Sequence, residues 1–358
     1  MKRPVVLFVV LSLIGLAGCE PEGASGDTPA QAYTTFFTPL PETAVFPADN
    51  PFSSEKAQLG EFLFWDPILS GRMNVACASC HHPDHGWADG RATSIGVDGM
   101  GLGPNRTGNA VTPRHSPTVL NVAFTGLQQT TPEADFVAGS YFWDLRAATL
   151  EDQAIEPIKS EVEMRSGDFL ETEIMPEIVL RLSMVPEYVS LFTAAFPGED
   201  PITESTIARA LATYQRTLTT QRTRFDDFLA GNDTALTPGE ITGLNKFING
   251  GCTDCHEGPM LSDNFIDAEK PIFTDKPAVR TPSLRNVAAT APYFHDGSRA
   301  TLNDAIAIYE ERGDLGVTLD DDDFGDIQRF LETLTDEGFS RQIPSYVPSQ
   351  LPVGGDIL

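Results

Sequence analysis

The chain has 358 residues, of which 41% are hydrophobic, and its 51 acidic side chains outnumber 24 basic ones to give a formal net charge of −27. This length suits two domains of ordinary size, and the hydrophobic content is that of a globular protein, not of a membrane bundle or a disordered chain. So acidic a surface repels nucleic acid and anionic lipid headgroups. We therefore expect no nucleic-acid partner, and a protein partner that is basic or largely uncharged.

The N-terminus has the layout of a bacterial secretion signal. A basic start precedes an apolar run from Val5 to Leu16, shorter than the ~20 residues that a mature membrane span needs. The run ends in Leu-Ala-Gly before Cys19, which resembles a lipobox. We predict that residues 1–18 are a lipoprotein signal peptide and that Cys19 is acylated; cleavage by ordinary signal peptidase is the alternative. The protein would lie on the periplasmic side of a bacterial membrane, with the outer membrane favoured, and touch it only through the lipid.

Residues 19–50 form a tether and N-terminal segment. The stretch from Glu20 to Gln31 consists mostly of small and polar residues, a composition typical of a flexible linker. We expect this stretch to connect the lipid anchor to the folded body.

Two Cys-x-x-Cys-His motifs use every cysteine except Cys19. Their chemistry-bearing residues are Cys77, Cys80 and His81, then Cys252, Cys255 and His256. In such a motif the thiols add to the haem vinyl groups and the adjoining histidine reaches the iron. A zinc site would want a second ligand pair at matched spacing, and a redox dithiol would not need the histidine. The pattern therefore predicts two covalently bound haem c groups.

Helical periodicity dominates the rest of the chain. Apolar stripes run through residues 207–218, 302–309 and 324–334, and the Thr237-Pro-Gly-Glu240 segment resembles a capping box. Residues 89–117 and 258–282 are rich in glycine and proline without clear periodicity, which predicts long loops that line something.

Similar amphipathic segments, residues 59–64 and 243–248, precede the two haem motifs and suggest two related domains. We predict a mainly α fold in which two cytochrome c-like haem domains pack against each other, with long loops. The N-terminal domain would span residues 51–220, the C-terminal domain 221–340 and a C-terminal tail 341–358, the helix at 203–218 connecting the halves.

Four strings carry a family resemblance. They are Ser116-Pro-Thr-Val-Leu-Asn121, Phe142-Trp-Asp-Leu-Arg146, Thr281-Pro-Ser-Leu-Arg-Asn-Val287 and Thr290-Ala-Pro-Tyr-Phe-His-Asp-Gly297. The chain from about Leu59 to Leu334 resembles the bacterial di-haem cytochrome c peroxidase and MauG family. The resemblance implies that the N-terminal haem handles peroxide and that the C-terminal haem relays electrons.

The same resemblance assigns roles to individual residues. His81 would be the proximal ligand of the peroxide-reactive haem and His256 that of the relay haem. Trp143 matches a tryptophan between the haems, although alone it would be a large core aromatic. Gln153, Pro157 and Glu163 match the distal pocket. Glu163 would move a proton between the peroxide oxygens, a task that suits a carboxylate whose pKa burial has raised; alone it would be an exposed charge.

Two departures from the peroxidase pattern point to the MauG-like branch. The position of the second axial methionine of the relay haem is Tyr309, as in MauG-type proteins, and an anionic phenolate favours Fe(III) and higher oxidation states. Simple core packing beside Leu302 and Ile306 is the alternative for Tyr309. The position of the distal histidine is Val97, which would leave the N-terminal haem open without prior reduction.

The family also binds calcium between its domains. The resemblance implies ligation by the backbone carbonyls of Thr290 and Pro292, but its asparagine ligand is His115 here. Imidazole is a poor ligand for Ca²⁺, so calcium is expected through carbonyls and waters.

These features favour a di-haem oxidase that uses hydrogen peroxide to form a high-valent di-haem state and then oxidises a partner protein. A lipoprotein with Tyr309 resembles the methanobactin-associated branch, which modifies a tryptophan of a copper-binding partner. The alternative is a cytochrome c peroxidase that detoxifies peroxide with electrons from a small cytochrome or cupredoxin. A purely electron-transferring cytochrome is a third reading, against which Gln153 and Glu163 argue, since a relay needs no proton-handling carboxylate.

Overall fold

The structure is a computed structural model that describes residues 29–130, 139–220 and 222–357. The predicted signal peptide and Cys19 lie outside these residues. Within them the regular structure consists of helices and short helical turns, joined by long loops with isolated β-bridges and no extended strand. The prediction of a mainly α fold with long loops is confirmed.

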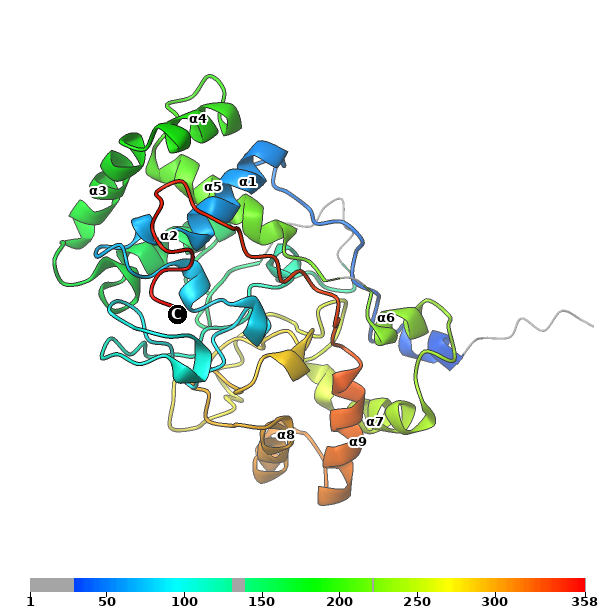
Figure 1. Ribbon diagram of the computed structural model, residues 1–358. Helices are drawn as coiled ribbons and strands as arrows, with labels where there is room; N and C mark the ends of the chain where they lie inside the picture. The colour runs from blue at the N-terminus through cyan, green and yellow to red at the C-terminus, as the bar shows by residue number, and fades with distance from the viewer. Residues whose placement is uncertain (1–28, 131–138, 221, 358) are drawn as a thin grey trace, which may run out of the picture.

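Five helices gather at one end of the molecule (Figure 1). They are α1 (Ser54–Trp65), α2 (Leu150–Lys159), α3 (Glu171–Ser183), α4 (Pro186–Ala195) and α5 (Glu204–Thr217). Helix α5 packs along both α1 and α2. The α1 backbone can approach α5 closely because Gly60 has no side chain: a Cβ there would lie 2.1 Å from the Ala210 carbonyl oxygen.

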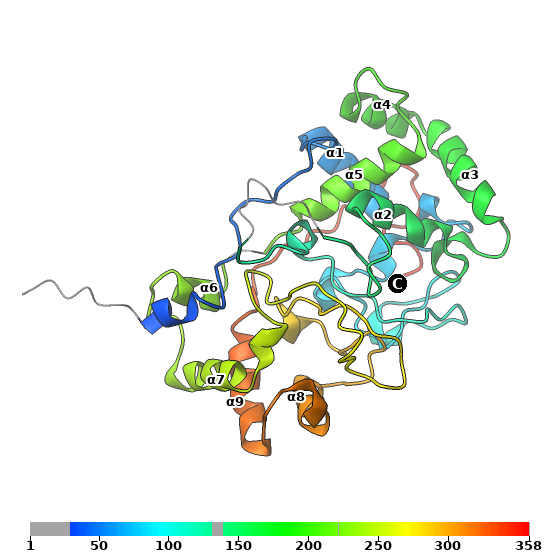
Figure 2. The same ribbon diagram turned by 180° about the vertical axis from the view of Figure 1, so that it is seen from behind.

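Four helices form the other end of the molecule (Figure 2). They are α6 (Arg224–Leu229), α7 (Pro238–Asn249), α8 (Leu302–Glu311) and α9 (Asp321–Glu332). The predicted capping box opens α7, since the Glu240 backbone N–H donates to Thr237 Oγ1 and the Thr237 N–H donates to the Glu240 carboxylate at 2.8 Å. A Cβ on Gly243 would lie 1.9 Å from the Asp326 carbonyl oxygen of α9. Gly60 and Gly243 thus each allow two helices to pack closely, in the two similar segments that precede the haem motifs.

Each half has its own apolar core, and each core borrows residues from the opposite end of the chain. The N-terminal core, built on α1 and α5, includes Phe339 and Val347 from beyond α9. The C-terminal core, built on α7 and α9, includes Ala30 and Phe37 from before α1. Figure 1 shows the last segment, in red, running from α9 back past α1 and α5. The predicted domain boundaries, which did not foresee this exchange of ends, stay a prediction.

The exchanged ends contact the first haem motif and the segment just after the second. Ser79 Oγ, inside the first motif, donates to the Gly354 carbonyl at 2.7 Å, and the Gly354 N–H donates to the Trp65 carbonyl at 2.7 Å. At the other end, the Gly258 N–H, two residues after His256, donates to the Phe36 carbonyl at 2.7 Å. The chain ends therefore help to close both motifs.

No single helix among the described residues is long and apolar enough to cross a membrane; only α3 and α4 together, bent by 101°, meet the length and composition required.

Candidate active site

Two cavities lie on either side of a common wall, and each contains one of the haem motifs. The N-terminal cavity, about 530 Å³, is lined by Cys77, Cys80 and His81. The C-terminal cavity, about 340 Å³, is lined by Cys252, Cys255 and His256. Both volumes fall in the ~300–1,000 Å³ range of small-molecule sites.

The Nδ1 atom of each motif histidine lies within hydrogen-bonding distance of a backbone carbonyl. His81 Nδ1 lies 3.3 Å from the Trp87 carbonyl oxygen, and His256 Nδ1 lies 3.0 Å from that of Leu261. A hydrogen bond from Nδ1–H fixes the tautomer that leaves Nε2 free to bind a metal. Burial lowers the pKa of His81 to about 4. Both imidazoles are therefore oriented as ligands, and His81 is neutral at physiological pH.

The distal side of the N-terminal cavity is formed by α2 and the π-helical turn η8 (Glu161–Arg165) that follows it. Gln153 and Pro157 lie on α2, and Glu163 lies in the turn; all three line the cavity with His81, as the resemblance implied. Such π-helical turns are rare and concentrate at functional sites. The structure thus brings the predicted proximal and distal residues together around one space.

The carboxyl of Glu163 is tuned by its surroundings. Burial raises its pKa, while the guanidinium of Arg146 and a hydrogen bond with Ser160 oppose that rise. Gly96 allows the turn to sit so close, because a Cβ at this position would lie 2.0 Å from the Val162 carbonyl oxygen. The Ser94–Val97 loop therefore supports the turn that carries Glu163.

Val97 belongs to the N-terminal apolar core and is not part of the cavity wall. The two histidines that line this cavity are His81 and His115. His115 is also held through Nδ1, which lies 2.7 Å from the Arg91 carbonyl oxygen. The loop that resembles the distal-histidine segment thus contributes Ser94 to the cavity, and no imidazole.

Tyr309 lines the C-terminal cavity together with His256. It projects from α8, and its hydroxyl has no hydrogen-bond partner within the described ranges. Burial raises its pKa, and the thiols of Cys252 and Cys255 act in the same direction. By contrast, the hydroxyl of Tyr293, in the same wall, donates to the Val287 carbonyl at 3.2 Å. The hydroxyl of Tyr309 therefore lacks a hydrogen-bond partner among the described residues, and the side chain lines the same cavity as His256.

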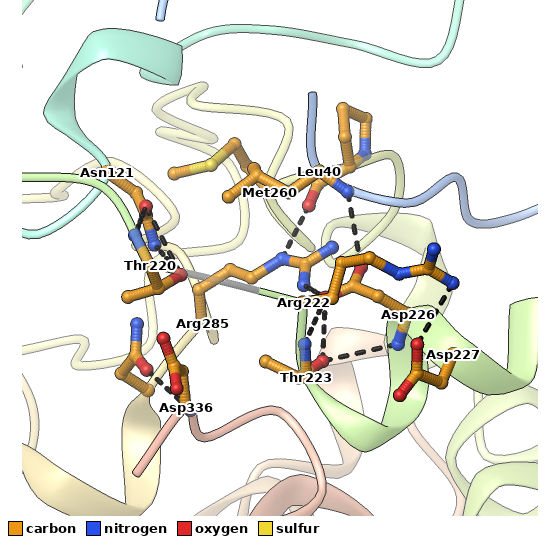
Figure 3. A network of polar contacts seen from close by, with 12 residues as sticks. Leu40, Asn121, Thr220, Arg222, Thr223, Asp226, Asp227, Met260, Arg285 and Asp336 are labelled. Carbon is orange, nitrogen blue, oxygen red and sulfur yellow. Dashed lines mark hydrogen bonds and ion pairs between the residues drawn. The ribbon is translucent and has the colours of Figure 1, made fainter. Parts of the chain in front are cut away.

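A buried ion pair holds the loop after His256 (Figure 3). Arg285 Nη1 donates to Asp226 Oδ2 at 2.6 Å with both side chains 1% exposed, and Arg285 Nε donates to the Pro259 carbonyl at 2.7 Å. Ser283 Oγ donates to the next carbonyl, that of Met260. Burial alone would raise the pKa of Asp226, but the guanidinium of Arg285 keeps it below its usual value. This network fixes the segment whose Leu261 carbonyl orients His256.

Trp143 lies in the wall that the two cavities share. The other residues of this wall are His115, Pro117, Thr118 and Arg280. The indole Nε1–H donates to the His115 carbonyl at 2.9 Å, and the ring meets that of His295 edge-on at 6.2 Å between centroids. Trp143 thus lies between the two cavities, and its role between the haems stays a prediction.

The predicted calcium residues lie in the C-terminal cavity wall. Thr290 and Pro292 line it with His115, whose Nδ1 is already engaged by Arg91. Asp296 acts on His115 electrostatically but is paired with Lys276. Since these residues offer no free carboxylate, they do not form a complete Ca²⁺ site, and calcium stays a prediction.

The donors of each cavity fit a covalently attached haem. Two thiols and a buried neutral imidazole converge on one largely apolar space, and burial raises the pKa of Cys77 and of Cys252 to about 12. A buried thiolate would be unfavourable there, whereas a thioether carries no charge. Within the described ranges, no group of three or more His, Cys, Asp and Glu side chains could hold a metal ion. A zinc site therefore finds no support.

Comparison with known proteins places the chain in one family. Residues 54–234 match the family model of the di-haem cytochrome c peroxidases. The chain is 34% identical to the cytochrome c551 peroxidase of Pseudomonas aeruginosa over 87% of its length and 88% of that protein. It is 32% identical to the methylamine utilization protein MauG of Methylorubrum extorquens, over 85% of each chain.

A solved structure agrees with these relatives. The crystal structure of a MauG-like protein associated with microbial copper homeostasis superposes with a TM-score of 0.67 at 30% identity, covering 83% of this chain and 95% of that one. The chain therefore belongs to the di-haem cytochrome c peroxidase and MauG family of haem oxidoreductases, which carry two haem c groups. The family resemblance drawn from the motifs is confirmed.

One residue of the shared wall was missed by sequence reasoning. Arg280 lines both cavities, and its guanidinium lies 5.9 Å from the Trp143 ring. Its only sequence signal is that it immediately precedes the Thr281–Val287 string. That signal says nothing about where a long side chain reaches.

Proposed function

We propose that the protein reduces hydrogen peroxide in the N-terminal cavity and uses the two oxidising equivalents to oxidise a partner protein. The observation that carries this proposal is the inequality of the two cavities. One is lined by the proton-handling side chains Gln153 and Glu163 together with His81, and the other by Tyr309 together with His256. A simple electron relay needs neither arrangement.

The haem irons, when bound, would supply the electrons that cleave the peroxide O–O bond. Glu163 would take a proton from one peroxide oxygen and deliver it to the other, the overall reaction being H2O2 + 2H⁺ + 2e⁻ → 2H2O. Burial raises the pKa of Glu163, which suits a group that must both accept and release a proton. Gln153, one helical turn from Pro157, would hold the peroxide by hydrogen bonding from the same wall.

Trp143 would carry oxidising equivalents between the cavities. Its ring lies in their shared wall and is fixed by the hydrogen bond to the His115 carbonyl. The MauG-like branch is favoured over a detoxifying peroxidase by two features: Tyr309 lines the same cavity as His256, and no imidazole from the Ser94–Val97 loop enters the N-terminal cavity.

Peroxide added to the oxidised, haem-loaded protein tests this function. We expect the haem absorption to change at once without prior reduction, with two electrons needed to restore the original spectrum. The oxidised protein should then lose these equivalents to an added oxidisable protein. Reaction only after one-electron reduction would instead establish the cytochrome c peroxidase alternative, and two haems inert to peroxide would leave electron transfer alone.

We further propose that the protein acts on the periplasmic side of a bacterial membrane, anchored through Cys19. The sequence pattern before Cys19 supports this location. Metabolic labelling with a radioactive or clickable fatty acid, compared with a Cys19→Ser variant, tests it. Label on the wild-type chain alone is the expected result.

A further inference from the structure

Arg280 is a cation between two cavities that each have to hold a large cofactor. Its backbone N–H donates to the Trp143 carbonyl at 2.9 Å, which fixes the segment to the shared wall. Its guanidinium donates from Nε to the Phe142 carbonyl at 3.0 Å and from Nη1 to Asn264 Oδ1 at 3.1 Å. The remaining N–H groups of the guanidinium have no partner among the described residues.

No carboxylate of the described chain pairs with Arg280. The other two arginines of the N-terminal cavity, Arg114 and Arg146, both pair with Asp144 at 3.0 and 2.8 Å. Burial lowers the pKa of Arg280 to about 10, so the group still carries its charge at neutral pH. A desolvated cation without a counter-charge is costly, and an arginine fork is suited to binding carboxylates.

We propose that Arg280 binds a propionate carboxylate of each of the two haems and so bridges them through one charge. Arg280 lines both cavities, and its guanidinium has more N–H donors than the two it uses within the protein. The ligand class follows from this position: an anionic side group of the cofactor that each cavity encloses. One guanidinium then compensates the negative charges of both propionates, at the wall that contains Trp143.

A second consequence rests on the proposed function, in which Trp143 carries oxidising equivalents. The guanidinium carbon lies 5.9 Å from the Trp143 ring. A cation at this range makes removal of an electron from the indole harder. Arg280 would thus act as a positioning residue that limits how much of the oxidising equivalent resides on Trp143.

The test compares Arg280→Gln with Arg280→Lys in the resting, haem-loaded protein. Spectroelectrochemical titration gives the midpoint potential of each haem, and resonance Raman gives the propionate bending bands. Loss of the cation destabilises the reduced, more negative state, so R280Q should lower both potentials and shift both sets of bands. R280K, which keeps the charge, should leave the potentials near those of the wild type. Arg299→Gln, which removes a cation outside both cavities, is the matched control and should change neither.

Unchanged potentials in R280Q would overturn the proposal, and a shift confined to one haem would overturn the bridging. Should R280Q fail to retain haem, R280K decides: wild-type potentials support the charge-based role, and lowered potentials contradict it. These measurements use no peroxide. A protein that shows the shifts but does not react with peroxide would keep this inference and lose the proposed function.

Discussion

Two glutamates of one helical turn, Glu161 and Glu163, differ in where their carboxylates lie. Glu163 faces the N-terminal cavity, whereas Glu161 is exposed and pairs with Arg165. We expect Glu163→Gln to slow the reaction with peroxide by ~10²–10⁴-fold, the usual contribution of a general acid or base. Stopped-flow absorption measures the rate, and the ferric spectrum should not change. Glu161→Gln is the control; an equal loss in both variants would deny Glu163 a specific role.

The direction of the Glu163 pKa shift predicts a pH dependence. Burial raises this pKa above the ~4.3 of an ordinary glutamate, so the carboxylate that accepts the peroxide proton is lost at a higher pH than usual. The rate should therefore fall as the solution is acidified through that pKa. Because Arg146 opposes the rise, Arg146→Gln should move the midpoint of the pH–rate profile upward. A midpoint that moves to lower pH or does not change would contradict the assignment of the profile to Glu163.

Tyr309 and Tyr293 form a second matched pair, in the C-terminal cavity. Only Tyr309 has a hydroxyl without a partner in the described protein. If the Tyr309 oxygen binds the iron of the relay haem, Tyr309→Phe should change the low-spin ferric signal of that haem. Tyr293→Phe should leave that signal unchanged. Electron paramagnetic resonance of the ferric protein measures both. An unchanged Tyr309→Phe spectrum would assign this tyrosine to core packing.

At this scale the sequence predicted what local spacing determines. Cys77, Cys80 and His81 are fixed relative to one another by a short turn, so their convergence could be foreseen, whereas Gln153 and Pro157 were assigned through the family resemblance alone. Arg280 could not be foreseen, because its place in both cavity walls depends on contacts with Phe142 and Asn264, distant in sequence.

At the scale of elements, the support beneath the distal turn matters most. Gly96 lies against the backbone of Val162 and Glu163, with no room for a Cβ. Gly96→Ala should push the turn away from the cavity, and a displacement of about 1 Å can lower a rate by ~10²-fold. Haem content should persist. Gly313→Ala, where a Cβ would meet nothing within 4 Å, is the control for stopped-flow comparison. A wild-type rate of reaction with peroxide in Gly96→Ala would show that the turn can shift without affecting catalysis.

The apolar stripes predicted α5, α8 and α9, whose apolar residues pack into a core, although α5 is buried on its polar side as well. Helices α3 and α4 were not singled out, since apolar residues also occupy their exposed faces: Leu180 of α3 is 56% and Val189 of α4 is 38% exposed. Periodicity weakens when both faces are apolar. The π-helical turn around Glu163 was also out of reach, because a five-residue turn has no period of its own.

At the scale of the whole molecule, stability depends on the exchange of chain ends. Val347, fully buried in the N-terminal core, and Ile343, 47% exposed, lie in the same C-terminal segment. We expect Val347→Ala to lower the free energy of unfolding by about 1–3 kcal/mol, and Ile343→Ala to change it by less than about 0.5 kcal/mol. Chemical denaturation followed by circular dichroism compares them. Similar small losses would show that the tail contributes little to the core.

The exchange of ends itself was not predictable from the sequence. The tail at residues 341–358 is short and rich in turn-forming residues, so nothing in its pattern indicates which half it covers. Its contacts with Asp66, where the Ser349 hydroxyl donates at 2.7 Å, join positions far apart along the chain. Such pairings follow from the assembled fold.

The hydrogen bond from Ser79 to Gly354 also bears on the order of biogenesis. A chain that emerges from its N-terminus exposes Cys77 and Cys80 long before residue 354 exists. The first motif is therefore left unclosed until the tail has been made, which leaves time for haem attachment to its thiols. The second motif meets its Phe36 partner as soon as it appears. We expect the two haems to be inserted in different windows, the earlier motif waiting longest for its enclosure.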